Sequence, residues 1–189
     1  MDWYEKLNEY FPAEEMKSRE HFERLMKEKE GLYVKEESPN HVLIYYEAKD
    51  YIFVDYIIVT GSIRGRGLGS SIMGKLMSKN KAIILEVDPI DTDDPETIKR
   101  VRFYERLGFT HAKTIDYKRR HIITNQLNVM DVFYWSHPPV TEQWVYKKMG
   151  EIYNEVHAYQ AKAIYGKSPQ STQEVLHITK QTISHQLVN

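Results

Sequence analysis

The residues best suited to chemistry in this sequence form a glycine-rich segment that could hold a phosphate, Arg64-Gly65-Arg66-Gly67-Leu68-Gly69. Its arginines supply positive charge, and its glycines let the backbone turn and approach a ligand where a side chain would clash. The segment lies between a predicted strand, Tyr51–Val59, and a predicted helix, Ser70–Lys79. The N–H groups that begin such a helix have no partner within it and carry the positive end of its dipole, so they suit a pyrophosphate.

Three phosphate-binding motifs compete for this segment. A P-loop ends in Gly-Lys-Ser/Thr, and that ending is absent here. A dinucleotide-binding fingerprint needs glycine at the position of Ser70 and follows the first strand of a parallel sheet, whereas this segment follows a third predicted strand. The pattern that fits is Arg-x-x-Gly-x-Gly, filled by Arg64, Gly67 and Gly69. A simple glycine-rich turn with exposed arginines is the alternative.

A second informative segment comes later in the chain, Arg102-Phe103-Tyr104-Glu105-Arg106-Leu107-Gly108-Phe109. This segment and the Arg-x-x-Gly-x-Gly pattern resemble the two signatures of the GNAT superfamily of acetyl-CoA-dependent N-acetyltransferases. The resemblance covers about residues 10 to 136, and the whole chain looks like a cytosolic group of GNAT proteins from Gram-positive bacteria. It implies acetyl-CoA as co-substrate but not the acceptor, because one scaffold serves many amines.

The resemblance also implies which backbone holds acetyl-CoA. In the family, the glycine-rich loop binds the pyrophosphate, and the end of the preceding strand pairs with the pantetheine arm as an added strand would. The corresponding residues here are Ile57, Ile58, Val59, Arg64, Gly65, Arg66, Gly67, Leu68, Gly69 and Ser70.

Tyr104 is the residue that the resemblance identifies as the proton donor. When an amine attacks the thioester, CoA leaves as a thiolate, and a phenol with a reference pKa of about 10 is protonated at pH 7 and can donate. The alternative is a core aromatic at helical spacing with Ile98 and Val101. Ile98 departs from the family, which often has an asparagine there that contacts CoA.

Asp55 is the predicted proton acceptor, because GNAT enzymes often place a carboxylate on the strand before the pyrophosphate loop. An amine like that of lysine has a reference pKa of about 10.4 and must lose a proton before or during attack. Asp55 lies in an apolar strand, where an acid is costly unless it is paired or functional and where desolvation would raise its pKa. Glu86, on the next strand, is the runner-up, and a water relay or a merely salt-bridged Asp55 are the alternatives.

Candidate contacts to the acceptor come from two places. Acidic side chains crowd the loop before the Tyr104 helix, at Asp88, Asp91, Asp93, Asp94 and Glu96. Such a cluster would attract a cationic amine, although a solvated loop in which Asp94 caps the helix is the simpler interpretation. The resemblance places the first helix and its lead at the acceptor pocket. The predicted substrate contacts are therefore Phe11, Glu14, Glu15 and Asp88.

A basic run, Lys118-Arg119-Arg120-His121, has several interpretations. It could bind the 3′-phosphate of CoA, a nucleic acid, or nothing, and a turn between strands with solvated charges is the interpretation that we favour. The eight histidines show no spacing typical of metal ligands, so no metal site is predicted.

The hydrophobic pattern predicts an α+β domain with a mixed, mostly antiparallel central sheet and flanking helices, as in the GNAT acyltransferase fold. Short breaks between the first three strands favour hairpins, and a βαβ unit follows them. The predicted helices and strands are, in order, Glu14–Lys29, Leu32–Glu36, Val42–Ala48, Tyr51–Val59, Ser70–Lys79, Ala82–Val87, Pro95–Leu107, Ala112–Tyr117 and Met130–Trp135.

The chain divides into two predicted parts. Residues 1–136 form the acetyltransferase domain, and residues 137–189 form an extension of two helices, Thr141–Tyr165 and Pro169–Gln186. An apolar stripe on the extension needs a partner surface, so we expect it to pack on the domain or at a dimer interface. The protein is accordingly expected to be a monomer or a homodimer.

Composition narrows the function further. The net charge of -1 does not suggest a nucleic-acid partner, and the absence of cysteine excludes disulfides and thiol nucleophiles. No apolar run approaches the ~20 residues of a membrane span, and the first residues do not resemble a signal peptide. We expect a cytoplasmic acyltransferase without metal, nucleic acid or membrane, which acetylates a small amine, an amino acid or a peptide or protein amino group by direct attack. A non-catalytic acyl-CoA-binding sensor or interaction module is the alternative.

Overall fold

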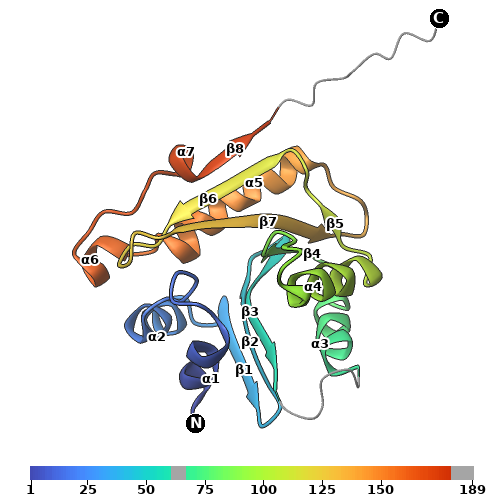
Figure 1. Ribbon diagram of the computed structural model, residues 1–189, viewed down its shortest axis with the longest axis horizontal. Coiled ribbons are helices and arrows are strands. Elements are labelled where there is room, and N and C mark those ends of the chain that lie inside the picture. Colours follow the sequence, from blue (N-terminus) through green and yellow to red (C-terminus); the bar gives the residue numbers. More distant parts are fainter. Residues whose placement is uncertain (61–66, 180–189) are drawn as a thin grey trace, which may run out of the picture.

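The computed structural model describes residues 1–60 and 67–179 and shows one eight-stranded sheet with helices on both faces (Figure 1). The strand order is β1-β2-β3-β4-β7-β6-β8, and β5 pairs with β7. The pairing of β3 with β4 is parallel, and the other described pairings are antiparallel. The predicted α+β class is therefore confirmed. The strands are β1 (Tyr33–Ser38), β2 (His41–Glu47), β3 (Tyr51–Val59), β4 (Ala82–Val87), β5 (Thr110–His111), β6 (Ile115–Arg120), β7 (Leu127–Trp135) and β8 (Leu176–Ile178).

The helices cover the two faces of the sheet (Figure 1). Helices α3 and α4 pack on one face, and α1, α2 and α5 pack on the other. The helical segments are α1 (Trp3–Tyr10), α2 (Arg19–Glu28), α3 (Leu68–Met77), α4 (Pro95–Arg106), α5 (Glu142–Ile152), the π-helical turn η2 (Tyr153–His157), α6 (Ala161–Tyr165) and α7 (Thr172–Val175).

Each face of the sheet has its own hydrophobic core. The first residues of β3 alternate between the two cores, so Phe53 packs under α2 and α5 while Ile52 and Val54 pack under α3 and α4. Because both faces are buried, the central strands are almost continuously apolar. This accounts for the accuracy with which β3 and β4 could be predicted from the sequence.

The predicted helix Glu14–Lys29 is wrong at its start. Its counterpart α2 begins only at Arg19, because the Ser18 hydroxyl caps it. Earlier in the chain, Trp3–Tyr10 form a separate helix, α1, which the sequence analysis missed. A capping box between Asp2 and Glu5 begins α1.

The predicted pair of C-terminal helices is also wrong. The range Thr141–Tyr165 is not one helix, since α5 passes into the π-helical turn η2 and the chain breaks again before α6. The described part of the range Pro169–Gln186, which ends at residue 179, contains the short α7 and then strand β8 instead of a long helix. Strand β8 pairs with β6 because the edge of β6 offers free backbone groups and Leu176 can be buried there.

Helix α5 completes the core beneath α1 and α2. Its residues Val145, Met149 and Ile152 are 0 % exposed and belong to the same cluster as Phe22 and Phe53. The apolar stripe of this helix is therefore buried within its own chain.

Candidate active site

A cavity of about 640 Å³ opens where strands β3 and β4 diverge. Their parallel pairing ends at Val54 and Leu85, although β3 continues to Val59 and β4 to Val87. The cavity is bounded by the rest of β3, the start of α3, one side of α4 and the segment between α1 and α2. Such a gap places one edge of a strand beside a concave site, where an extended ligand can pair with it.

A β-bulge lies at the point of divergence. Tyr45 of β2 is opposite Val54, and Ile44 is opposite Tyr56, so Asp55 is the extra residue on β3. As a result, Asp55 and Tyr56 both face the layer of α1 and α2. The bulge breaks the period of two, and the face occupied by Asp55 could not be read from the sequence.

The start of α3 forms one wall of the cavity. Gly67 caps the helix with φ of 84°, a conformation that is strained for a residue with a side chain. A Cβ on Gly69 would lie 3.2 Å from the ring of Phe103, so glycine allows the helix to approach α4 closely. Residues Leu68–Ser70 line the cavity, and their N–H groups have no partner within the helix.

Helix α4 lines the opposite wall with positive charge. Arg102 and Arg106 are exposed, lie one turn apart and have no ion-pair partner in the part of the chain that the structure describes. Arg100 also lines the cavity and forms an ion pair with Asp88. This side of the cavity is suited to phosphate groups.

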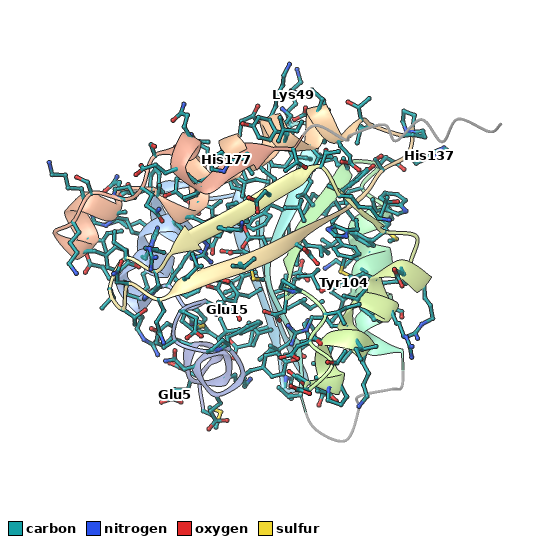
Figure 2. All side chains as sticks on the ribbon, turned by 45° about the horizontal axis from the view of Figure 1, so that its top comes forward. Glu5, Glu15, Lys49, Tyr104, His137 and His177 are labelled. Atoms are coloured by element: carbon teal, nitrogen blue, oxygen red, sulfur yellow. The ribbon has the colours of Figure 1, made fainter. Side chains whose placement is uncertain are left out.

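Tyr104 enters the cavity from α4 and is labelled in Figure 2. Its side chain is 5 % exposed, and its hydroxyl forms no hydrogen bond to any described residue. Burial raises the pKa of Tyr104 to about 12, so the phenol remains protonated throughout the neutral range. A hydroxyl in this state can act as a proton donor.

Asp55 lines the cavity but is held in a buried ion pair. Lys17 Nζ donates to Oδ1 of Asp55 at 2.7 Å and to Oδ2 at 2.9 Å, and the Tyr33 hydroxyl also donates to Oδ2. The side chains of Lys17 and Asp55 are 7 % and 2 % exposed. The carboxylate is thus satisfied by three hydrogen bonds from two donor groups, which matches the salt-bridged alternative for this residue.

Glu86 lies on the same face of the sheet as Asp55, and Lys17 interacts electrostatically with both carboxylates. Nε2 of His157 is 2.8 Å from Oε1 of Glu86, and the Arg119 guanidinium is 3.9 Å from Oε2. Burial alone would raise the pKa of Glu86, but His157, Arg119 and Lys17 outweigh this effect and hold the pKa at about 2. A carboxylate this weakly basic is a poor proton acceptor at neutral pH.

Glu15 lines the cavity from the segment between α1 and α2, across the central strands from Tyr104 (Figure 2). Burial and the nearby Asp88 carboxylate raise the pKa of Glu15 to about 8, and this rise is only partly offset by Arg100 and Arg119. A carboxyl group with a pKa near the working pH is suited to take up a proton. The sequence analysis proposed Glu15 only as a substrate contact.

The other predicted cofactor contacts divide into three groups. Ile57 and Val59 line the cavity. Ile58 is 2 % exposed and packs into the opposite core, so only its backbone is available. The remaining loop residues, Arg64, Gly65 and Arg66, lie outside the described residues.

The other predicted substrate contacts are also only partly brought together. Phe11 lines the cavity, whereas Glu14 and Asp88 are not among its described lining residues. Asp94 caps α4 by accepting from the Glu96 N–H at 3.0 Å, as the simpler interpretation of the acidic loop requires.

The interpretation of the basic run as a solvated turn is wrong. Its first three residues belong to strand β6, and the alternation of the strand turns Arg119 inward while Lys118 and Arg120 are exposed. His121 is 7 % exposed, and its Nε2 lies 3.0 Å from the carbonyl oxygen of Met16.

The sequence analysis missed Lys17 and His157, which hold the two buried carboxylates. Lys17 is separated from Asp55 by 38 positions, and His157 is separated from Glu86 by 71. No local sequence pattern distinguishes either residue. Each falls within a predicted helix, at a position where a polar, solvent-exposed side chain is expected. Only Arg119 could have been suspected from the sequence, because it is a charged residue that lies just after a predicted strand.

The described residues form neither a metal site nor a membrane-spanning helix. Within residues 1–60 and 67–179, no group of His, Asp and Glu side chains could hold a metal ion. In the same ranges, no helix combines the length and the apolar character needed to cross a bilayer.

Comparisons with known proteins match most of the chain. A profile of the Acetyltransferase (GNAT) family matches residues 1–109. The Bacillus subtilis protein "Putative acetyltransferase YjbC" is 47% identical over 178 residues, covering 94% of this chain and 93% of that protein. A solved structure described as "Putative acetyltransferase from GNAT family from Bacteroides thetaiotaomicron" superposes with a TM-score of 0.64 at 20% identity, over 87% of this chain and 90% of the other.

Proposed function

The chain belongs to the GNAT acetyltransferase family, and we propose that it transfers an acetyl group from acetyl-CoA to a primary amine by direct attack. The acceptor is a small amine, an amino acid, or an amino group of a peptide or protein. The observation that carries this proposal is the cavity in which the part of β3 that diverges from β4, the start of α3 and Tyr104 meet.

The lining of this cavity suits the parts of acetyl-CoA. The N–H groups of Leu68–Ser70, which have no partner within α3, would hold the pyrophosphate at the positive end of the α3 dipole. The edge of β3 beyond Val54 would pair with the amide groups of the pantetheine arm. Arg102 and Arg106 would neutralise a further phosphate at the mouth of the cavity.

We assign Tyr104 as the acid that protonates the leaving sulfur. Its phenol lines the cavity, is protonated at neutral pH, and has no competing hydrogen bond among the described residues. A proton delivered as the C–S bond breaks avoids releasing a free thiolate into a buried site.

We assign Glu15 as the base, in preference to the sequence-based candidates Asp55 and Glu86. Asp55 would have to surrender its ion pair with Lys17 before it could accept a proton. Glu86 is held ionised with a pKa of about 2, whereas the pKa of Glu15 is about 8. Of the three carboxyl groups, Glu15 has the proton affinity best matched to an ammonium group near pH 8.

In the proposed step, the amine attacks the thioester and CoA leaves as its thiol. The neutral amine nitrogen forms a bond to the thioester carbonyl carbon, and the bond from that carbon to sulfur breaks. Glu15 accepts the proton that the nitrogen loses, and Tyr104 gives its proton to the sulfur. Both groups then exchange protons with solvent, so the products are an N-acetyl amide and the CoA thiol.

A thiol-release assay with acetyl-CoA across amines, amino acids and peptides tests the proposal. We expect turnover with at least one acceptor class. The Tyr104→Phe variant should bind acetyl-CoA as the unmodified protein does but turn over ~10²-fold more slowly. Tyr134→Phe is the matched control, because Tyr134 lies on β7 outside the cavity and should keep full activity.

Two outcomes would contradict this assignment. Unchanged turnover in Tyr104→Phe would remove Tyr104 from the acid role. Binding of acetyl-CoA without acetylation of any acceptor would instead favour the non-catalytic acyl-CoA-binding alternative.

A further inference from the structure

A second cavity, of about 280 Å³, lies beside the first. Three parts of the chain form it: the segment from Glu15 to His21, the end of β6 with the residues that follow, and the C-terminal segment 153–170. Glu15 and Arg119 line both cavities, so these two side chains form a shared wall. The proposed function leaves this second cavity without a role.

The second cavity is strongly biased toward positive charge. Among its described lining residues, Glu15 is the only acid, and its raised pKa keeps it largely protonated at neutral pH. Of the cations, Lys17 is neutralised by its pair with Asp55. The cationic lining residues are Lys17, Arg119, Arg120 and Lys167. A cavity with this balance suits an anionic group rather than a second ammonium group.

Arg119 is the central cation of the second cavity, because part of its buried guanidinium has no hydrogen-bond partner among the described residues. Its side chain is 13 % exposed, and its Nε has no hydrogen-bond partner among the described residues. The nearest carboxylate oxygen, on Glu86, is 3.9 Å away, too far for a hydrogen bond, and Glu86 is already bonded to His157. A buried guanidinium in this state is costly unless a ligand completes its hydrogen bonds.

A second lining residue is also polar and buried. His21 is 1 % exposed, and its Nδ1 lies 3.0 Å from the Tyr165 hydroxyl, while Nε2 has no partner of good geometry among the described residues, although the Val156 carbonyl lies on its side of the ring. Burial lowers the pKa of His21 to about 3, so the ring is neutral and contributes a polar edge without charge. The buried Nε of Arg119 is therefore the observation that indicates a site built for a polar ligand, and His21 adds a neutral polar wall.

We propose that the second cavity receives the acceptor, and that the acceptor is a small amine that carries a carboxylate, of the amino-acid type. Arg119 binds the carboxylate and Glu15 meets the amine. This inference rests on the proposed acetyl transfer and narrows its acceptor class.

The geometry of the shared wall supports this pairing of groups. In an α-amino acid, the amine and the carboxylate are attached to the same carbon, so they must bind to neighbouring protein groups. Arg119 and Glu15 are such neighbours, and both also face the cavity that is assigned to acetyl-CoA. The planar fork of an arginine fits a carboxylate through two parallel hydrogen bonds. The rest of the acceptor would extend toward Lys167 and Gln170 at the rim.

The test compares acceptors that differ only in the carboxylate. For alanine, glutamate, lysine and phenylalanine, kcat/KM is measured for the acid, its carboxamide and the decarboxylated amine, corrected for the unprotonated fraction of each. We expect at least one acid to exceed its carboxamide by 10-fold or more. The Arg119→Gln variant should reduce this ratio to about 1, and Arg119→Lys should restore part of it.

Lys118→Gln is the matched control, because Lys118 is the exposed neighbour on β6 and lies outside both cavities. It should leave the ratio of acid to carboxamide unchanged. Circular dichroism and thermal unfolding establish that each variant is folded. If Arg119→Gln does not fold, the ratio in the unmodified protein together with Arg119→Lys still decides the question.

Three results would overturn the inference. The first is acetyl transfer to neutral amines with no preference for any acid, which leaves the proposed function standing. The second is a preference for the acid that persists in folded Arg119→Gln. The third is a lack of transfer to every amine, which removes the proposed function as well.

Discussion

At the residue scale, the carboxyl groups around the first cavity differ in what they touch. Asp55 and Glu86 are each held by a cation or a histidine, whereas Glu15 is held beside a second carboxylate. The cation and the histidine around Glu86 favour its ionised form, and the carboxylate beside Glu15 favours the protonated form of Glu15. Glu86 therefore stays a structural anion, Asp55 is occupied by its ion pair with Lys17, and Glu15 can exchange protons near neutrality.

The Glu15→Gln variant should reveal this difference in its pH profile. The pKa of Glu15 is about 8, raised by burial and Asp88 against the opposing effects of Arg100 and Arg119. Below pH 6 the protonated carboxyl resembles glutamine, so both proteins should have similar kcat/KM. Above pH 8 Glu15 is ionised and can accept a proton, so the unmodified protein should be faster by ~10²-fold. Both proteins are measured with the same acceptor. Titration of the acceptor amine then affects both pH profiles equally and cancels in the ratio of their kcat/KM values. A ratio independent of pH would exclude Glu15 as the base.

The Asp55→Asn variant should have a lower free energy of unfolding, while the pH dependence of its kcat/KM should match that of the unmodified protein. It would leave the Lys17 ammonium buried without its partner, which costs about 3–5 kcal/mol. Denaturant unfolding measures this loss, with Asp50→Asn as the control. Asp50 pairs with Lys148 at 3.0 Å, but its side chain is 50 % exposed, so its loss should cost less than about 1 kcal/mol. If the ratio of kcat/KM between Asp55→Asn and the unmodified protein instead changed through pH 8, Asp55 would regain the role of base.

At the element scale, the turn into α3 fixes the position of the N–H groups proposed to bind pyrophosphate. Gly67 has φ of 84°, and alanine there is strained by about 1–2 kcal/mol. We therefore expect Gly67→Ala to weaken acetyl-CoA binding by roughly 5- to 30-fold, if the strain is relieved by moving the first turn. Isothermal titration calorimetry measures the affinity.

Gly74→Ala provides the control within the same helix. Gly74 is exposed in the middle of α3, and a Cβ would meet nothing within 4 Å. Alanine should therefore stabilise the helix by up to about 1 kcal/mol and leave the affinity unchanged. Equal affinities for both variants would show that the conformation of Gly67 is not needed for binding.

The elements that the sequence predicts well are those with local signals. Strand β4 agrees with its predicted range, Ala82–Val87, because a buried parallel strand is a continuous apolar run. Helix α4 begins as predicted, at Pro95 after its Asp94 cap. Helix α1 also has a local signal, because Asp2 and Glu5 have the spacing of a capping box, but it was not predicted.

The features that could not be predicted depend on distant parts of the chain. The bulge at Asp55 appears only when β2 is laid against β3. The π-helical turn that carries His157 toward Glu86 has no marker of its own in the sequence. Strand β8 forms because β6 offers an edge, although its residues also fit a helical pattern. The start of α3 and Tyr104, to which the sequence patterns pointed, thus line the larger cavity, whereas the partners of the buried carboxylates had no local signal.

At the scale of the whole molecule, helix α5 belongs to the hydrophobic core that lies beneath α1 and α2. Met149 of α5 is 0 % exposed and packs with the residues beneath α1 and α2. Met149→Ala should therefore cost about 2–5 kcal/mol of the free energy of unfolding, a loss to be measured by denaturant titration. Val129→Ala, at a position 38 % exposed on β7, should change it by no more than about 0.5 kcal/mol. A loss below 1 kcal/mol for Met149→Ala would mean that the C-terminal segment folds as a separate unit.

The two cavities draw on different stretches of the chain, and this division has an evolutionary consequence. Apart from Arg119 and Met130, the described lining of the larger cavity comes from residues 10–106, within the region that matches the family profile. The smaller cavity is built mainly from residues 119–170. Mutations after residue 109 can therefore reshape the second cavity with few changes to the first. Relatives that share the cavity proposed to hold acetyl-CoA can therefore differ in the acceptor that they use. A chimera that exchanges only the C-terminal half between two relatives should have the acceptor preference of the relative that supplied that half.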